Sequence, residues 1–201
     1  MALLSLFESN YEKTLMWVLI GVFLDSFDGL VARAFRATTE IGKQLDSLCD
    51  VISFGVVPGY FMYKYLSDFL SYELVPLSLS AFVVTLASIF RLARFNITPS
   101  SQLDFQGLPT PAFALFVIGI PFIPYEINPI IITVIVALLT VLMVSKIMLP
   151  SQKFVNGKPS NFFWIFAVVA IPVLLIFRSQ ALSLTVLTYA FFGMLYMRLR
   201  A

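Results

Sequence analysis

Acidic side chains recur in a part of this chain that is otherwise apolar enough to cross a membrane. Residues 25 to 50 read DSFDGLVARAFRATTEIGKQLDSLCD. A charged carboxylate is costly inside a membrane, so an intramembrane aspartate indicates a functional site by default. Four aspartates, three small residues and one arginine stand out in this stretch: Asp25, Asp28, Gly29, Ala32, Arg33, Gly42, Asp46 and Asp50.

The spacing of these eight residues predicts one chemically active face on each of two helices. Positions 25, 28, 29 and 32 follow an i, i+3, i+4, i+7 pattern, and positions 42, 46 and 50 follow i, i+4, i+8. At about 1.5 Å of rise per residue, Asp25 lies roughly 12 Å inward from Arg33, and Asp50 roughly 10 Å inward from Lys43. In an antiparallel hairpin the four carboxylates therefore converge in a cup that opens toward the cytoplasm.

Carboxylates that converge in this way predict a metal site that handles a diphosphate. Four carboxylates a few ångströms apart repel one another strongly unless divalent cations neutralise them. The chain has no histidine, so oxygen must hold the metal, which favours Mg²⁺ or Mn²⁺. Two such cations can clamp a diphosphate and stabilise the departing phosphate. Gly29, Ala32 and Gly42 leave room for a bulky group against the backbone, and Arg33 can contact phosphate oxygens in a bidentate manner.

Each of these residues also has a simpler explanation when it is considered alone. A single intramembrane aspartate can be a hydrogen-bonding partner in helix packing or part of a proton relay. Gly29 and Gly42 are typical of close contacts between membrane helices, and Ala32 is a common filler. The joint pattern of four aspartates with small residues on the same faces favours the metal site.

The composition predicts a polytopic membrane protein. Of the 201 residues, 60% are hydrophobic and 12% are charged, with a mean hydropathy of +0.94, whereas a soluble domain would carry about twice that charge. The net charge of +2 is too small to suggest nucleic-acid binding, and the single cysteine, Cys49, excludes an intrachain disulfide.

Apolar runs of about 20 residues recur along the chain. They predict an all-α bundle of about seven full spans, in a single integral-membrane catalytic domain covering residues 1–201. The apolar Met1–Phe7 is too short for a signal peptide or a span, and we interpret it as a short N-terminal remnant of another helix. The expected spans are Leu15–Phe35, Ile41–Leu66, Val75–Arg94, Thr110–Phe122, Pro129–Lys146, Phe162–Phe177 and Leu182–Met197.

The basic residues predict the orientation of these spans. With the loop between the first two spans in the cytoplasm, the far side receives only Lys13, Lys64 and Arg178. This arrangement places the acidic cup and the C-terminus on the cytoplasmic side of the membrane. That side receives ten basic residues: Arg33, Arg36, Lys43, Arg91, Arg94, Lys146, Lys153, Lys158, Arg198 and Arg200.

The pattern D-x-x-D-G-x-x-A-R, eight residues, G-x-x-x-D-x-x-x-D resembles the signature of the CDP-alcohol phosphotransferases, and all eight fixed positions match. The resemblance implies a CDP-linked lipid donor, two divalent cations, a homodimer, and attack of an acceptor hydroxyl on the β-phosphate with release of CMP. It implies that Asp25, Asp28 and Asp46 are metal ligands, and that Asp50 is the general base and contacts a metal as well. The donor would be bound by the following residues: Asp25, Gly29, Ala32, Arg33 and Gly42.

Four outer segments resemble the bacterial and archaeal phosphatidylserine synthases within this family. They are SLCDVISFGVVPG (Ser47–Gly59), RLARFN (Arg91–Asn96), FQGLPTPA (Phe105–Ala112) and LMVSKI (Leu142–Ile147). This resemblance implies CDP-diacylglycerol, or an archaeal ether analogue, as donor and L-serine as acceptor. Polar groups at the cytoplasmic helix ends could bind the serine carboxylate or a lipid phosphate, although arginine and lysine at such ends usually anchor a helix at the interface. These candidates are Arg91, Arg94, Asn96 and Lys146.

Three other functions stay open at this point. The same chemistry on glycerol phosphate or inositol phosphate would require more basic residues around the cup. An intramembrane prenyltransferase also uses aspartate-rich helices with Mg²⁺, but the Gly-x-x-Ala-Arg after Asp28 argues against it. A cation transporter would continue its polar residues toward the far side, where the later helices are almost uniformly apolar.

Two features depart from the family pattern. Members usually have a complete helix before the motif helix, and here only MALLSLF precedes the charged turn Glu8–Lys13. Some relatives lack the two helices of the C-terminal extension, at about residues 159–201, and the sequence assigns them no role.

Overall fold

The protein is described here from a computed structural model. The structure describes residues 1–34, 39–70, 72–97, 105–123, 125, 127–150, 154–155, 158–159 and 181–200, and among these it leaves undescribed the side chains of residues 26, 28–34, 43, 72–76, 105, 154–155, 158–159 and 199–200. The chain divides into two compact units, Met1–Thr98 and Pro99–Ala201.

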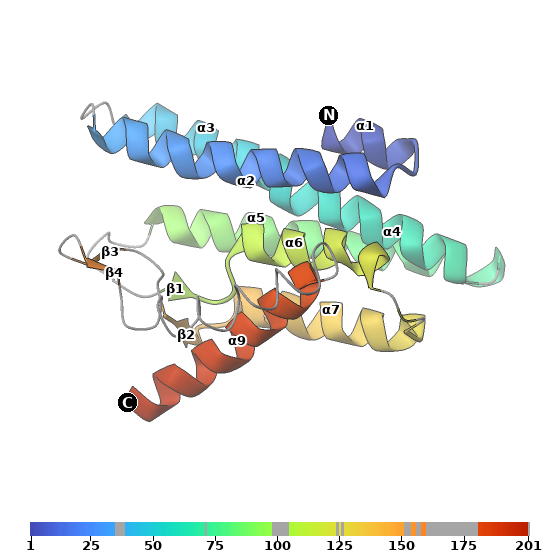
Figure 1. Ribbon diagram of the computed structural model, residues 1–201. Helices are drawn as coiled ribbons and strands as arrows, with labels where there is room; N and C mark the ends of the chain where they lie inside the picture. Colours follow the sequence, from blue (N-terminus) through green and yellow to red (C-terminus); the bar gives the residue numbers. More distant parts are fainter. Residues whose placement is uncertain are drawn as a thin grey trace. The chain divides into compact units, whose positions relative to one another are not determined.

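The first unit consists of helices that run back and forth (Figure 1). A short helix α1 turns into the long helix α2, the chain then runs back in the opposite direction through α3 and α4, and α5 runs in the direction of α2 again. Asn10 caps the start of α2, because its Oδ1 accepts a hydrogen bond from the Lys13 backbone N–H at 3.0 Å. The elements are α1 (Ala2–Phe7), α2 (Tyr11–Ala34), α3 (Glu40–Asp50), the π-helix η1 (Val51–Val56), α4 (Val57–Phe69), the 3₁₀-helix η2 (Tyr72–Phe82) and α5 (Val83–Ile97).

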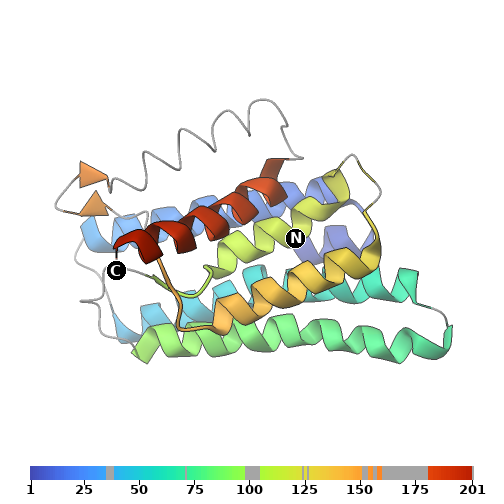
Figure 2. The ribbon, with the colours of Figure 1, turned by 90° about the horizontal axis from the view of Figure 1, so that it is seen from below.

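Several of the expected spans are confirmed in the part of the chain that the structure describes. Three helices there are long and apolar enough to cross a membrane: Glu40–Phe69, Leu77–Ile97 and Ala181–Arg198. The first of them joins α3, η1 and α4, and η2 continues directly into α5 (Figure 2). The expected helix at Leu15–Phe35 is present as α2, and the expected spans at Thr110–Phe122 and Pro129–Lys146 are shorter apolar helices. The expected span at Phe162–Phe177 lies outside the described residues.

Helix α5 packs closely on the segment after Asp50 because two glycines face it. A Cβ atom added at Gly55 would lie 3.0 Å from the Cβ of Ser88, and one added at Gly59 would overlap Thr85 Oγ1. Thr85 Oγ1 donates a hydrogen bond of 3.0 Å to the Gly55 carbonyl. Glycines four residues apart are typical of membrane helices whose backbones approach closely. This contact sets the distance between α5 and the helix that carries Asp50.

We expect Gly59→Ala to lower the stability of the protein by about 1–3 kcal/mol, because overpacking forces Thr85 to move and to lose its bond to Gly55. Thermal unfolding in detergent measures the loss. Gly21→Ala is the matched control, since its Cβ would meet Phe54 at an ordinary 3.8 Å. Thr85→Ala removes the overlapping oxygen, so Gly59→Ala should cost less in that background. An equal cost in both backgrounds would contradict this account of the contact.

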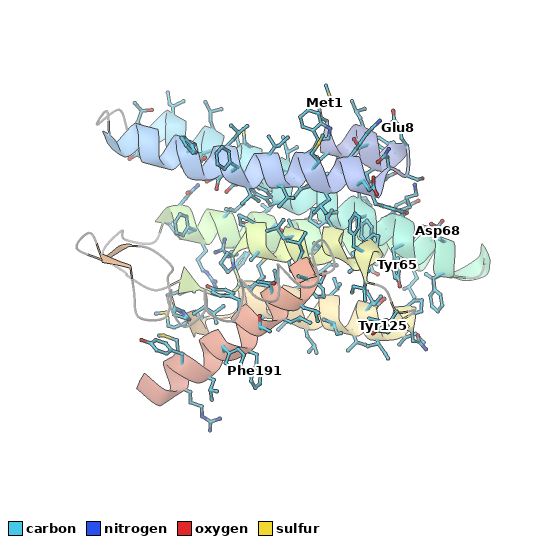
Figure 3. All side chains as sticks on the ribbon, in the orientation of Figure 1. Met1, Glu8, Tyr65, Asp68, Tyr125 and Phe191 are labelled. Atoms are coloured by element: carbon cyan, nitrogen blue, oxygen red, sulfur yellow. The ribbon has the colours of Figure 1, made fainter. Side chains whose placement is uncertain are left out.

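The far end of the first unit is rich in aromatic side chains. Phe7 lies 4.8 Å from Tyr60, and Tyr11 lies 5.8 Å from Phe61, measured between ring centroids. The Lys64 ammonium donates to the Leu6 carbonyl and to the Ser9 hydroxyl, so it closes the turn after α1. Glu8, Tyr65 and Asp68 gather at this same end (Figure 3). Tyrosines beside charged groups are typical of a membrane interface.

The second unit combines helices with two very short strand pairs, which the all-helical prediction did not include. Strand β1 (Phe105–Gln106) pairs antiparallel with β2 (Met148–Leu149), and β3 (Phe154–Val155) with β4 (Lys158–Pro159). The helices are α6 (Thr110–Gly119), the 3₁₀-helix η3 (Ile120–Phe122), α7 (Pro129–Val144) and α9 (Ala181–Arg200).

Two of the four outer segments named above, FQGLPTPA and LMVSKI, contact each other in this unit. The Gly107 N–H donates to the Ile147 carbonyl at 2.9 Å, next to the β1–β2 pair. Gly107 has φ +71°, and a Cβ there would overlap the Met143 carbonyl, so glycine is required on both counts. The exposed Lys146 lies in the loop that this contact holds.

Helix α9 of the C-terminal extension is an integral part of the second unit. Ser183 is buried and donates a 2.8 Å hydrogen bond to the Phe116 carbonyl of α6. Tyr189 donates to the Pro150 carbonyl at 3.2 Å, just after β2. The outer face of α9 carries exposed apolar side chains such as Phe191 (Figure 3). Helix α9 therefore supports both α6 and β2.

Candidate active site

Asp25 on α2 and Asp50 on α3 lie together in the first unit. Their carboxyl groups are within hydrogen-bonding reach, and both residues are half-buried. The two helices run in opposite directions (Figure 1), as the hairpin interpretation requires. The structure therefore brings together the deepest aspartate of each predicted face.

Two more charged groups act on Asp50. The Asp46 carboxylate, one helical turn earlier on α3, interacts with it electrostatically, and so does the Arg91 guanidinium of α5. Asp46 is exposed, whereas Arg91 is only 6% exposed. Three helices thus contribute charge to one place, with an acidic excess that an additional cation would relieve.

The helix changes type immediately after Asp50. Asp50 ends α3, and the next six residues form the π-helix η1. A π-helical segment inserts extra backbone into a turn, and such segments often occur at functional sites. The side chains after Asp50 are consequently rotated relative to the face that carries Asp46 and Asp50. The spacing of apolar residues in the sequence carries no signal for this change.

Part of the motif lies on α2 beyond the described side chains. The backbone is helical through Ala34, so Asp28, Gly29, Ala32 and Arg33 are on the predicted helix, and no contact of their side chains is described. Among the side chains that the structure does describe, no group of three or more histidine, cysteine, aspartate or glutamate residues is arranged to hold a metal.

Gly42 has a local role at the start of α3. Its N–H donates a 3.0 Å hydrogen bond to Thr39 Oγ1, which caps the helix. A Cβ at Gly42 would lie 3.0 Å from that same oxygen, so a larger residue would disturb the cap. This contact supports a structural role for Gly42 in the helix cap. The predicted role of Gly42 in donor binding stays a prediction.

The two polar residues near the end of α5 point in different directions. The Asn96 side chain contacts α3: its Nδ2 lies 2.9 Å from Ser47 Oγ and 3.4 Å from Gln44 Oε1. The Arg94 guanidinium lies 6.0 Å from the centroid of the Phe90 ring. Residues two apart differ by about 200° around a helix, so Arg94 and Asn96 do not face the same group. Ser47 and Gln44 carry no individual signal of a site residue in the sequence, although both are polar neighbours of Asp46.

The donors of this site are of the chemical type that suits a hard divalent cation, although the described ones are not arranged as a complete ligand set. Asp25, Asp46 and Asp50 offer carboxylate oxygens, which Mg²⁺ and Mn²⁺ prefer. A cation held by these residues would relieve the repulsion between the Asp25 and Asp50 carboxylates. Lys146 belongs to the second unit, where it lies in the loop between α7 and β2.

A family model described as CDP-alcohol phosphatidyltransferase matches residues 1–149. The chain is 33% identical to the CDP-diacylglycerol–serine O-phosphatidyltransferase of Bacillus subtilis over 153 residues, which are 76% of this chain and 83% of that protein. It is 36% identical to the protein of the same name from Methanocaldococcus jannaschii over 180 residues, which are 89% and 81% of the two chains.

An archaetidylserine synthase from Methanothermobacter thermautotrophicus is also similar, with 36% identity over 110 residues, 54% of this chain and 46% of that protein. The range matched by the family model contains the whole acidic motif and α5, and it ends before α9.

Proposed function

Because the chain belongs to the CDP-alcohol phosphatidyltransferase family and is a transferase, we propose that it moves the phosphatidyl group of CDP-diacylglycerol, or of an archaeal ether analogue, to the hydroxyl of L-serine and releases CMP. The observation that carries the proposal is the contact between the half-buried Asp25 and Asp50, with Asp46 and Arg91 beside them. Carboxylates from two helices at one point provide both cation ligands and a base.

In the proposed reaction, Asp50 accepts the proton of the serine hydroxyl as the serine oxygen bonds to the β-phosphorus of the donor. The bond from that phosphorus to the CMP oxygen breaks, and CMP leaves with the electron pair. Asp25, Asp28, Asp46 and Asp50 would hold two divalent cations, Mg²⁺ or Mn²⁺, which polarise the phosphorus and stabilise the leaving phosphate when they are bound. Arg91 balances the negative charge around Asp50.

The donor's nucleotide would lie along the α2 and α3 faces that carry the small residues. Gly29, Ala32 and Gly42 permit close approach to the backbone, and Arg33 would contact phosphate oxygens. The lipid chains of the donor would remain in the membrane, since exposed apolar side chains such as Phe23 and Phe27 flank Asp25 on α2.

We further propose that the chain acts as a single integral-membrane catalytic domain, as a homodimer, with the acidic site facing the cytoplasm of a prokaryotic cell. The distribution of basic residues supports this orientation. In the first unit, Lys64 lies at the end with Ser9, and Arg94 at the end where α5 meets α3. Cross-linking in native membranes tests the dimer, and protease access in inverted vesicles tests the orientation.

One assay tests the proposed function directly. Purified protein in detergent or in vesicles receives CDP-diacylglycerol with L-serine, inositol phosphate or glycerol phosphate in parallel, and CMP release is measured. We expect CMP release to depend on serine and to produce a serine lipid. Release with a phosphorylated alcohol instead would identify another acceptor within the same chemistry. No CMP release with any acceptor would reject the proposed function.

Arg94 is the proposed contact for the serine carboxylate, with Arg91 and Lys146 as further candidates for serine or phosphate. We expect Arg94→Ala to raise the KM for serine about 10-fold or more and to leave the KM for the donor nearly unchanged, since a charge-assisted hydrogen bond contributes about 1.5–3 kcal/mol. Arg94→Lys should recover only part of the loss, because lysine lacks the planar fork.

A different result would show that Arg94 only anchors its helix. Its guanidinium lies over the Phe90 ring, which is an anchoring contact. Phe90→Leu removes the ring and keeps Arg94, so it is the matched control. If Arg94→Ala and Phe90→Leu both lower expression and neither changes the serine dependence, Arg94 is an anchor.

A further inference from the structure

A small hydrogen-bonded cluster joins α5 to α3 beside the acidic site. Ser47 Oγ lies 3.1 Å from Asn96 Oδ1 and 2.9 Å from Asn96 Nδ2, and that same Nδ2 lies 3.4 Å from Gln44 Oε1. Ser47 and Asn96 are half-buried, and Gln44 is exposed. Both ends of the Asn96 amide are therefore directed at α3.

Because Ser47 lies between Asp46 and Asp50 on α3, this cluster can control where the two carboxylates point. Ser47 directly follows Asp46 and precedes Asp50 by three residues. The side chains of Ser47 and Asp50 therefore lie about 60° apart around the helix axis. A helix with its side chains has a radius of about 5–6 Å, so a rotation of 10° moves a carboxylate by about 1 Å. Displacements of about 1 Å can lower a rate about 100-fold. The rotation of α3 must therefore be held closely.

The helix on the other side of the cluster is itself firmly placed. Helix α5 packs on η1 and α4 through Gly55, Gly59 and Thr85, and its Arg91 acts on Asp50. The Thr39 cap holds the first turn of α3, and the π-helix η1 follows its last residue. Ser47 and Gln44 thus link α3 to α5 by hydrogen bonds between the cap and Asp50.

We propose that Asn96 is a positioning residue that acts through Ser47, and that it fixes the rotation of α3 so that Asp46 and Asp50 face the reacting groups. On this proposal the Asn96 side chain does not bind serine. Its direction, nearly opposite to that of Arg94 around α5, agrees with a contact to α3. The proposal rests on the proposed function, since its readout is the transfer of the phosphatidyl group.

A double-mutant cycle tests whether Asn96 acts through Ser47. We expect Ser47→Ala and Asn96→Ala each to lower kcat about 10-fold or more, with the KM for serine changed less than about 2-fold. The double variant should be no slower than the slower single variant. Ser47→Thr keeps the hydroxyl and should recover much of the rate.

The control is a pair of hydrogen-bonded serines elsewhere in the same unit. Ser67 donates a 2.9 Å hydrogen bond to Ser78, which joins α4 to η2 and involves no residue of the acidic site. Ser67→Ala and Ser78→Ala should couple in thermal stability and leave kcat unchanged. A general effect of removing a buried hydroxyl would lower kcat in both pairs.

Two outcomes overturn the proposal. If Asn96→Ala raises the KM for serine while Ser47→Ala leaves it unchanged, Asn96 binds the acceptor. If the two losses in kcat multiply in the double variant, the residues act independently. Both outcomes require an active wild-type enzyme, so they are distinct from failure of the proposed function, in which the wild-type protein releases no CMP.

Discussion

Asp50→Asn should lower kcat about 10²–10⁴-fold, which is the usual contribution of a positioned general base. Asparagine keeps the shape of the side chain but cannot accept the proton of the serine hydroxyl. Because the base acts mainly in the transition state, the KM for the CDP donor should change much less than kcat. The measurement is steady-state CMP release at saturating metal, so that any weakened metal binding is overcome.

Asp68→Asn is the matched control, since Asp68 lies at the end of α4 beside Tyr65 (Figure 3). It should keep the wild-type rate. Arg91→Gln separates the roles around Asp50 further, because it removes the positive partner and leaves the base in place. Near-wild-type turnover in Asp50→Asn would show that another group accepts the proton.

Removal of divalent cations should abolish transfer, and Mg²⁺ or Mn²⁺ should restore it. Asp25→Asn, Asp28→Asn and Asp46→Asn should each raise the cation concentration needed for half-maximal activity about 10–100-fold or more, because the loss of even an outer partner of a metal ligand lowers metal affinity by about that factor. Binding of Mn²⁺, followed by electron paramagnetic resonance without substrate, provides a readout independent of turnover.

The three variants differ in what they test. Asp25 is placed against Asp50 by the structure, whereas the role of Asp28 rests on its position in the motif. Asp46 is exposed, so its variant should fold normally and lose metal affinity. Full metal affinity in Asp28→Asn, with loss in the other two, would reduce the ligand set to three carboxylates.

Much of the helical organisation could be read from the sequence, because a helix repeats locally. The face that carries Asp46 and Asp50 follows from their spacing of four residues. The apolar lengths of the segments at Glu40–Phe69 and Leu77–Ile97 follow from composition alone. The contact between Asp25 and Asp50 was also expected, since a short connection between two helices forces an antiparallel pair.

Other features of the candidate site depend on residues far apart in the chain. The place of Asn96 at a helix end predicts a contact with the acceptor, and this role stays a prediction. What the structure adds is the contact of its amide with Ser47, 49 positions away. The close approach of α5 depends on Gly59 and Thr85, which belong to different helices. A polar residue at a helix end has the same local pattern whether it faces a substrate or another helix, so only packing distinguishes the two.

The sequence by itself determined the residue chemistry of the site and the helix faces that present it, because charge and helical periodicity are local properties. Tertiary structure decided how those faces are oriented. The π-helix after Asp50 changes the register of the helix without a local signal in the sequence. The hydrogen bonds of Asn96 with Ser47 and of Gly107 with Ile147 join segments that are far apart in the chain. These features depend on the packing of the apolar helices, which brings together polar groups whose hydrogen-bonding partners no local pattern specifies.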